Sequence, residues 1–364
     1  MLIDDSTIIR ALLREVLSTQ DDIEVVAFAG NGRLALPRLR YHKPDFVILD
    51  YEMPEMNGIE TLEHIVKEHP EIRVIMFSTH TVDGARITMR ALEIGAIDFL
   101  PKPSTVRAED PKQYILDNLV PRLRAIRDSG RALPHLYSAE KPAGGRTVTD
   151  PTAPTARKAA TPAPPPVDPE HRAGEFDICA IGISTGGPVA LKLLFQNLPI
   201  LNGSVVITQH MPPLFTRQLA ETLDRVSPMK VVEAEDGMKV VRGQAYVAPG
   251  DKHMLLKRST DKMIIRLDDA PPYQHCKPSV NLMYNSLLEL VPRRTLSVIM
   301  TGMGNDGSEA LAKLHAAGSH ILAQSEESCV VYGMPAGPTR DGLARESLDV
   351  LGLASRISVL LGTK

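Results

Sequence analysis

Short apolar runs alternate with segments of helical periodicity over the first third of the chain. The runs are Leu2–Ile3, Val25–Ala29, Phe46–Leu49, Val74–Phe77 and Ile97–Leu100. Between them, Ile8–Leu17 and Leu34–Arg40 place apolar residues at the spacing of one helix face. Strands separated by helix-length segments are typical of βαβ units, which build a parallel sheet. The pattern predicts a doubly wound α/β domain over residues 1–120.

This alternation stops before the middle of the chain. The stretch from Pro134 to Ala173 is rich in Pro, Ala and Thr and has almost no aliphatic periodicity. Such a sequence buries too little apolar surface to offset its ordering entropy. We therefore assign residues 121–172 to an extended, Pro-rich linker.

From Phe176 the alternation resumes, which predicts a second α/β domain over residues 173–364. Strands are expected at Phe176–Ile183, Val205–Thr208, Val231–Glu233 and Leu296–Thr301. An antiparallel edge is expected from three further runs, Tyr246–Ala248, Met254–Lys257 and Met263–Leu267. The fold class is thus α/β, with two doubly wound parallel sheets.

The net charge, the cysteine count and the length of the apolar runs exclude several classes of protein. The chain has 364 residues, a net charge of −3 and three cysteines. This charge gives no support for nonspecific binding to nucleic acid or to an anionic membrane. No apolar run has the length of a transmembrane helix, and the acidic start does not resemble a signal peptide. The cysteines are too few and too scattered for a disulfide framework or a zinc site, and we expect a cytoplasmic protein.

Polar residues follow the apolar runs of the first domain. Asp4 and Asp5 follow the first run, Asp50 the third, Ser78 the fourth and Lys102 the fifth. In a doubly wound sheet these strand ends converge on one edge. Carboxylates there suit Mg²⁺, and a lysine beside a hydroxyl suits a phosphoryl group. The alternative is that Asp4 and Asp5 only cap the helix that begins near Ser6.

This set resembles the receiver domain of two-component response regulators. The matching residues are Asp4-Asp5, Leu49-Asp50-x-x-Met53-Pro54-x-Met56-x-Gly58, Ser78 and Lys102-Pro103. The resemblance implies that Asp50 accepts a phosphoryl group. It also implies that Mg²⁺ is held by Asp5, the Asp50 carboxylate and the backbone carbonyl of Glu52, with Asp4 assisting.

The same resemblance implies a conformational switch. Ser78 would be the switch hydroxyl, with adjacent Thr79 as an alternative, and Phe99 would be its aromatic partner beside Lys102. The first strand is only Leu2–Ile3, whereas receiver domains usually begin several residues earlier. We expect either a start upstream of Met1 or a domain less stable than its relatives.

Three strand-end signals stand in the second domain. Ser184 lies in Gly-x-Ser-x-Gly, the pattern of a nucleophile elbow. His210 and Asp306 follow two other predicted strands and could supply the general base and its orienting carboxylate. Taken singly, each has a simpler explanation. The Gly-rich turn could cradle a phosphate, the histidine could be structural, and Asp306-Gly307 could be a turn.

The order of these residues separates this chain from one common hydrolase fold. Here the order is Ser, His, Asp, whereas the α/β-hydrolases have the acidic residue before the histidine. The glycines around Ser184 permit a tight turn, and free amides at the following helix start favour a developing oxyanion.

The second domain resembles the chemotaxis-type protein-glutamate methylesterase. The matching motifs are Ile181-Gly182-x-Ser184-Thr185-Gly186-Gly187-Pro188, Gln209-His210-Met211-Pro212, Tyr246-Val247-Ala248-Pro249-Gly250, Thr301-Gly302-Met303-Gly304-x-Asp306-Gly307 and Cys329-Val330-Val331-Tyr332-Gly333-Met334-Pro335. The resemblance implies Ser184 as nucleophile, His210 as base and Asp306 as its orienting residue. It places Thr185 and Met303 near the oxyanion and the base. Asn281 departs from the family, which usually has Asp there.

The two resemblances together imply a phosphorylation-regulated serine hydrolase. Its substrates would be glutamate methyl esters and particular glutamines of methyl-accepting chemoreceptors, and its phosphodonor a sensor histidine kinase. Mg²⁺ would serve the receiver, and the hydrolysis would need no cofactor. Two other classes of protein make different demands on the sequence. A DNA-binding regulator would need a small basic output domain, which residues 176–364 do not resemble. A noncatalytic scaffold would use the turn from Gly182 to Gly187 to bind a receptor tail or nucleotide.

Overall fold

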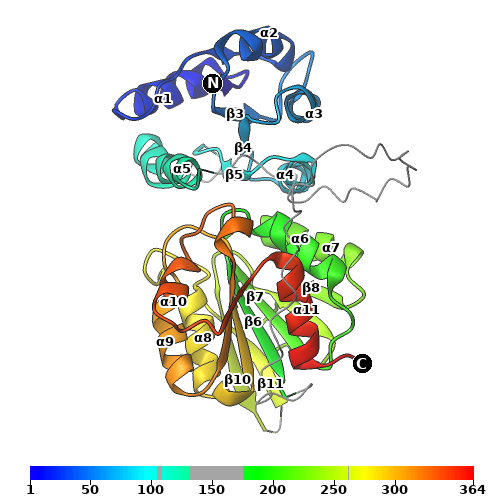
Figure 1. Cartoon of the computed structure of the whole chain (residues 1–364). Coiled ribbons are helices and arrows are strands. Elements are labelled where there is room, and N and C mark those ends of the chain that lie inside the picture. Colours follow the sequence, from blue (N-terminus) through cyan, green and yellow to red (C-terminus); the bar gives the residue numbers. More distant parts are fainter. Residues whose placement is uncertain (105–108, 131–174, 261) are drawn as a thin grey trace, which may run out of the picture.

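The computed structural model describes residues 1–104, 109–130, 175–260 and 262–364 as two α/β units (Figure 1). Both units have parallel sheets covered by helices, as the sequence predicts. Most of the predicted linker, residues 131–172, lies outside the described residues.

The N-terminal unit is a five-stranded parallel sheet in the order β2-β1-β3-β4-β5. Its elements are β1 (Leu2–Ile3), α1 (Thr7–Leu17), β2 (Phe28–Ala29), α2 (Gly32–His42), β3 (Phe46–Asp50), α3 (Gly58–Glu68), β4 (Arg73–Ser78), α4 (Val82–Ile94), β5 (Asp98–Pro101) and α5 (Pro111–Asp128). Helices α1 and α5 pack together, while α2, α3 and α4 form a second contiguous group. The apolar side chains of β3 and β4 alternate between these two layers, because successive strand residues point to opposite faces.

Two boundaries in this unit differ from the sequence prediction. The strand expected at Val25–Ala29 is only Phe28–Ala29, because its partner β1 offers only two residues for pairing. Helix α5 continues past residue 120 to Asp128, where Ile126 is fully buried. The helix therefore occupies the beginning of the segment that we assigned to the linker.

The C-terminal unit is built on a seven-stranded sheet in the order β14-β13-β12-β6-β7-β9-β8, in which every paired neighbour is parallel. Its elements are β6 (Ile178–Ile183), α6 (Gly187–Asn197), β7 (Ser204–Gln209), α7 (Phe215–Val226), β8 (Lys230–Glu233), β9 (Gln244–Val247), β10 (His253–Ser259), β11 (Lys262–Asp268), α8 (Val280–Leu288), the 3₁₀ turn η2 (Pro292–Arg294), β12 (Thr295–Ile299), α9 (Ser308–Ala316), β13 (His320–Gln324), the 3₁₀ turn η3 (Glu326–Ser328), α10 (Ala336–Arg340), β14 (Glu346–Leu348) and α11 (Val350–Leu361). Helices α6, α7 and α11 contribute to one apolar layer, and α8 and α9 to the other.

The predicted antiparallel edge is wrong in one element. Strands β10 and β11 pair antiparallel, as expected, but form a separate two-stranded sheet. The run around Tyr246 belongs instead to β9, which lies parallel between β7 and β8 in the main sheet. Residues Ala245, Tyr246 and Val247 are all buried, and such a continuous apolar run is typical of a parallel strand covered on both faces.

The two units meet through α4, which packs on α6 and α7 (Figure 1). Phe99 of β5 stacks on Phe215, with ring centroids 4.5 Å apart and planes 21° from parallel. His80 Nε2 lies 2.9 Å from the carbonyl oxygen of Pro213, to which it donates a hydrogen bond. An ion pair of 3.0 Å joins Glu93 to Lys192. The contact therefore combines an aromatic stack, a hydrogen bond and a charge pair.

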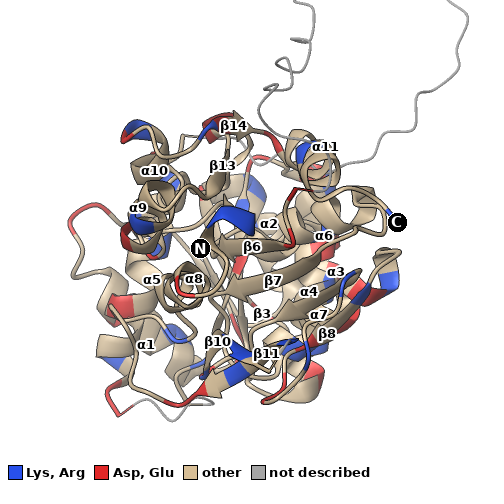
Figure 2. Cartoon of the chain, turned by 90° about the horizontal axis from the view of Figure 1, so that it is seen from below, with Lys and Arg blue, Asp and Glu red and all other residues tan. Residues whose placement is uncertain are grey.

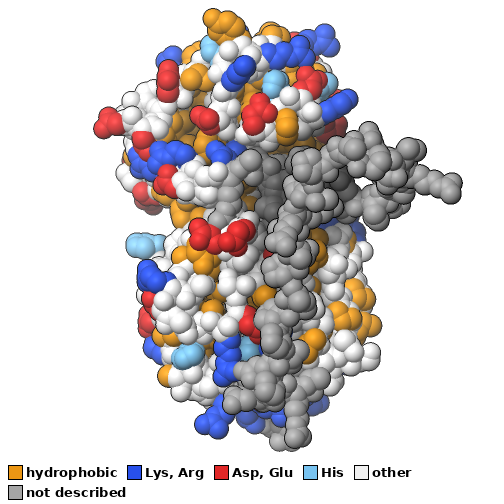
Figure 3. Space-filling model, in the orientation of Figure 1, with side chains coloured by type: hydrophobic (Ala, Val, Ile, Leu, Met, Phe, Trp, Pro, Cys, Tyr) orange, Lys and Arg blue, Asp and Glu red, His pale blue; other side chains and the backbone are white. Residues whose placement is uncertain are grey.

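Charged side chains are mixed over the visible surface. Figure 2 shows Lys and Arg interspersed with Asp and Glu around the described part of the chain seen from below. Figure 3 shows the same mixture on the described face of the N-terminal unit. None of the helices in the described residues combines the length and apolar character needed to cross a bilayer.

We expect Phe215→Ala to weaken the contact between the units, and Phe195→Ala to serve as its matched control. Both rings are fully buried in the C-terminal unit, so each truncation should cost about 3–5 kcal/mol of the free energy of unfolding. Only Phe215 stacks on Phe99. Hydrogen exchange should therefore accelerate in α4 of the Phe215 variant alone. Equal exchange of α4 in the two variants would contradict this role of the stack.

Candidate active site and receiver site

Three adjacent strands deliver the predicted catalytic residues to one edge of the larger sheet. Ser184 follows β6, His210 follows β7, and Asp306 lies in the loop after β12. Strand β6 pairs with both other strands, and Ile183 is in register with Gln209. The amide of His210 donates to the carbonyl of Ile183 at 3.1 Å, so the two loops leave the sheet together. The topology therefore brings all three residues to the carboxyl ends of neighbouring strands.

The turn that carries Ser184 is fixed by close backbone packing. The Ser184 amide donates to the carbonyl of Thr301 at 2.9 Å, and the Ser184 carbonyl accepts from the Gln209 amide side chain at 3.0 Å. A Cβ at Gly302 would lie 2.7 Å from the Ser184 Cβ, and one at Gly187 would lie 1.9 Å from Gln209 Oε1. Both contacts exclude a side chain, which explains these two glycines. Ser184 itself is half-buried.

Asp306 is held at the N-terminus of α8. Its Oδ1 accepts hydrogen bonds from the Ser279 hydroxyl at 3.0 Å and from the Asn281 amide at 2.9 Å. Its Oδ2 accepts from the Val280 amide at 2.7 Å. These are free amides of a helix start, where the helix dipole also favours a negative charge. The carboxylate is 4% exposed, so its donors compensate for the loss of water.

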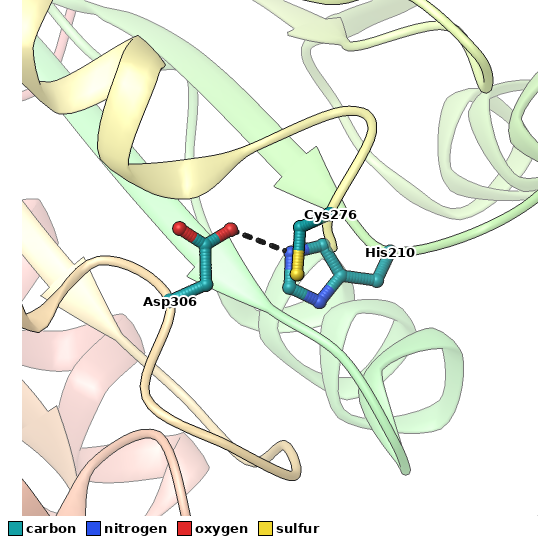
Figure 4. A group of neighbouring side chains, drawn as sticks. All are labelled: His210, Cys276 and Asp306. Carbon is teal, nitrogen blue, oxygen red and sulfur yellow. Dashed lines mark hydrogen bonds and ion pairs between the residues drawn. The ribbon is translucent and has the colours of Figure 1, made fainter. Parts of the chain in front are cut away.

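His210 forms the fourth contact of this carboxylate. Its Nε2 lies 2.9 Å from Asp306 Oδ2 (Figure 4), which leaves Nδ1 as the second ring nitrogen. Burial by itself would lower the pKa of His210, but interactions with Asp306 and the Cys276 thiol outweigh burial and raise that pKa to about 9. Burial would likewise raise the pKa of Asp306, yet His210 and the backbone amides hold that pKa below its ordinary value. The carboxylate therefore favours the protonated form of the imidazole.

The two residues assigned near the oxyanion lie at the boundary with the N-terminal unit. Thr185 is buried, and its side chain lies near Asp98 of β5, where it lowers the pKa of that carboxyl against the larger raising effect of burial. Met303 packs in an apolar cluster that includes Val330 and Val331 of the C-terminal unit and side chains of the N-terminal unit. A movement of the N-terminal unit would therefore change the surroundings of both residues.

Cys276 was not assigned to this site from the sequence. It closes a tight turn in which Tyr273 and Cys276 exchange two backbone hydrogen bonds of 3.0 and 2.9 Å. The turn places the thiol beside His210 and Asp306 (Figure 4). The sequence places Cys276 three residues before Ser279, and Ser279 holds Asp306 by a hydrogen bond between distant segments. Only the tertiary fold therefore reveals that Cys276 lies at the site.

Asn281 and His253 hold the loop and the helix start that carry the partners of Asp306. The Asn281 side chain accepts from the Ala310 amide at 3.0 Å and donates to Gln274 at 3.3 Å. His253 accepts from the Ser279 amide at Nδ1, at 3.1 Å, and donates through Nε2 to the Pro271 carbonyl. His253 is thus a buried structural histidine with local partners.

The acidic residues of the N-terminal unit gather around Lys102. The ammonium lies 2.9 Å from Asp4 Oδ2 and 2.7 Å from Asp50 Oδ2. Burial and the charge of Asp4 raise the pKa of Asp50 to about 6, although Lys102 acts in the opposite direction. Asp5 is exposed, and it offers a carboxylate oxygen within 4.8 Å of those of Asp4 and Asp50. The Glu52 side chain points to solvent, leaving its backbone as the expected contact.

Unpaired polar atoms in this pocket fit a cation and a phosphoryl group. Asp50 Oδ1 and the Ser78 hydroxyl are buried and have no hydrogen-bond partner among the described residues. Buried oxygens of this kind are suitable ligands for Mg²⁺ and for a covalently attached phosphoryl group. The Thr79 hydroxyl, by contrast, lies 3.4 Å from that of Thr81. Of these two hydroxyls, Ser78 is the one that is buried without a partner among the described residues.

Comparison with known protein families agrees with this two-part organisation. A model described as CheB methylesterase matches residues 179–357, and a response regulator receiver domain model matches residues 1–109. The chain is 40% identical over 359 residues to the protein-glutamate methylesterase/protein-glutamine glutaminase of Nocardioides sp., which covers 98% of this chain and 93% of that protein. The protein of the same description from Salmonella typhimurium is 38% identical over 348 residues, covering 96% and 92% of the two chains.

Solved structures give partial matches. The CheB methylesterase catalytic domain of Thermotoga maritima is 38% identical, with a TM-score of 0.49, and covers 50% of this chain and 97% of that one. The response regulator domain of Thermotoga maritima CheB is also 38% identical, with a TM-score of 0.31, and covers 34% and 90%.

We expect Asp306→Asn to lower the pKa of His210 from about 9 by at least about one unit. The substitution removes the partner charge, while the burial that disfavours imidazolium remains. Titration of the His210 ring by NMR measures this pKa directly. Asp349→Asn is the matched control, because Asp349 caps α11 in the same unit and makes no contact with His210. An unchanged His210 titration in Asp306→Asn would contradict the pairing.

Proposed function

The chain belongs to the family of protein-glutamate methylesterases/protein-glutamine glutaminases with a receiver domain, and we propose that Ser184, His210 and Asp306 carry out its hydrolysis. The substrates are γ-glutamyl methyl esters and particular glutamine amides on methyl-accepting chemoreceptors. The observation that carries this proposal is the buried His210–Asp306 pair of 2.9 Å at the strand edge that also carries Ser184. The enzyme acts in the cytoplasm.

The proposed chemistry is acyl transfer in two steps. Because Nε2 of His210 is directed at Asp306, Nδ1 is the nitrogen that takes the Ser184 hydroxyl proton. The serine oxygen attacks the side-chain carbonyl, and His210 returns the proton to methanol or ammonia as it leaves. Water then attacks the acyl-enzyme, with His210 again as base, and releases glutamate. The base form of His210 increases as the pH rises through about 9.

Electrostatic stabilisation comes from the turn after β6. Helix α6 begins at Gly187, and Gly186 precedes it with a φ of 78°, which favours glycine. The Gly187 amide donates to the Ser184 carbonyl at 2.8 Å and Pro188 has no amide hydrogen, so a developing oxyanion would be held by the remaining amides of this turn. Thr185 and Met303 border this region, where they shape the approach of the substrate.

The receiver controls this chemistry through Asp50. Mg²⁺ would be held by Asp5, Asp50 and the Glu52 carbonyl, with Asp4 assisting, and when bound it neutralises charge on the incoming phosphoryl group. Phosphorylation of Asp50 adds negative charge that pairs with Lys102 and accepts a hydrogen bond from Ser78. A sensor histidine kinase is the phosphodonor.

Coupling between the sites runs through β5 and the loop after β4. Phe99 stacks on Phe215, and the preceding Asp98 lies near the side chain of Thr185, which follows the nucleophile directly. A rearrangement of Ser78 and Phe99 on phosphorylation would loosen both contacts. In the unphosphorylated protein, the receiver, which ends with α5 at Asp128, restrains the methylesterase domain, residues 173–364.

Ser184→Ala should lower the rate of methanol release from methylated receptor membranes by at least about a thousandfold. The variant lacks the hydroxyl that forms the acyl-enzyme but retains the remaining site. Ser358→Ala is the control, because this hydroxyl bonds within helix α11 and should leave the rate unchanged. Methanol release within tenfold of the unmodified protein would remove Ser184 from the mechanism.

A small acyl phosphate with Mg²⁺ should raise esterase activity of the full chain, because phosphorylation of Asp50 relieves the restraint. Asp50→Asn should abolish this stimulation while keeping the unstimulated rate. Asp45→Asn, a change at the opposite end of β3, should respond like the unmodified protein. Stimulation that persists in Asp50→Asn would show that Asp50 is not the regulatory acceptor.

A further inference from the structure

Three potential metal ligands of different chemistry meet in the C-terminal unit. His210, Cys276 and Asp306 each offer one ligand atom, and these atoms lie within 4.8 Å of one another (Figure 4). The thiol comes from the loop before α8, whereas the other two residues follow β7 and β12. The spacing of the cysteines along the chain argued against a zinc site, but the fold supplies the missing ligands from distant segments.

The donor set suits Zn²⁺. An imidazole nitrogen, a thiolate sulfur and a carboxylate oxygen are its common protein ligands, and a tetrahedral site with three protein ligands keeps a fourth position for water. Bonds of about 2.0–2.2 Å place the nitrogen and oxygen ligands about 3.3–3.6 Å apart. His210 Nε2 and Asp306 Oδ2 are 2.9 Å apart, so the pair needs to open by only a few tenths of an ångström.

The ligands are already positioned for such a site. Asp306 keeps three donors besides His210, namely Ser279, Val280 and Asn281, and these fix the orientation of the carboxylate. A cation that replaces the proton between Nε2 and Oδ2 leaves these three bonds intact. Hydrogen-bonded ligands of this kind bind metals more tightly, because less orientation is lost on binding.

The thiol is also held in place. The turn that presents Cys276 has its two central residues, Gln274 and His275, at φ values of 48° and 66°. Glu309 of α9 anchors it by accepting from the Tyr273 hydroxyl at 2.9 Å and from the Gln274 amide at 3.3 Å. Cys276 is partly exposed, and the His210 side chain is 17% exposed, so a cation from solvent can reach both.

We propose that His210, Cys276 and Asp306 form an inhibitory Zn²⁺ site. The metal displaces the proton of the His210–Asp306 pair and the proton of the thiol, with water as its fourth ligand. Metal binding and general-base catalysis exclude each other. Catalysis needs His210 hydrogen-bonded to Asp306, whereas the bound metal takes the place of the proton between them. The inhibition rests on the proposed function, whereas the binding does not.

Cobalt(II) provides a test of binding that is independent of activity. The full chain titrated with Co²⁺ should develop the near-ultraviolet charge-transfer band of a thiolate–cobalt bond at one equivalent, and Zn²⁺ should remove it by competition. Cys276→Ser should abolish the band. Cys329→Ser is the matched control, because Cys329 is buried away from this cluster, and it should keep the band. A band that is absent from the full chain, or retained in Cys276→Ser, would overturn the proposal.

Zinc titration of the esterase rate tests the consequence, with each protein compared with its own metal-free rate. Cys276→Ser should need at least about tenfold more Zn²⁺ for half-inhibition, because one of the three protein ligands of the metal is lost. A chelator should restore the original rate. Equal zinc sensitivity of the two proteins, with the cobalt band present, would overturn the inhibitory role alone. A chain without esterase activity but with the band would contradict the proposed function and leave the binding site standing.

Discussion

The burial of the Asp306 carboxylate is the constraint on which the C-terminal unit depends. A buried, unpaired carboxylate would cost several kcal/mol or would become protonated. Here it accepts from the Ser279 hydroxyl, two amides of α8 and His210. The same four bonds fix where α8 begins and orient the imidazole. They also tie the loop after β12 to the segment before α8, so local helix capping and the geometry of the active site are one arrangement.

Much of this arrangement could be predicted because it follows from local sequence. Apolar runs ending in Ser184, His210 and Asp306 predict a parallel sheet with these residues at one edge. The placement of β9 could not be predicted, because an apolar run such as Ala245–Val247 does not reveal the direction of its partner. Cys276 and Phe215 were missed for another reason. Their partners, His210 and Phe99, are supplied by chain segments that only the tertiary fold brings close.

Both sites contain buried charged groups whose interactions change when the site works. Around Lys102, two carboxylates are held close together by one ammonium, and burial raises the pKa of Asp50 to about 6. Around His210, burial is outweighed by the Asp306 carboxylate and the Cys276 thiol. In the first site a cation and a phosphoryl group would rearrange the charges, and in the second the proton of the Ser184 hydroxyl would. Asp98 and Phe99 lie between the two sites, where Asp98 is near Thr185 and Phe99 stacks on Phe215.

The stack of Phe99 on Phe215 bears on the basal activity of the unphosphorylated enzyme. An aromatic pair of this geometry contributes about 0.5–1.5 kcal/mol beyond simple burial. Since 1.4 kcal/mol corresponds to about a factor of ten, the ring contact alone shifts the ratio of released to restrained molecules by about two- to tenfold. Under the restraint proposed above, this pair of rings would set part of the basal turnover of the unphosphorylated enzyme. Substitutions at either ring could tune this basal level without altering the catalytic residues.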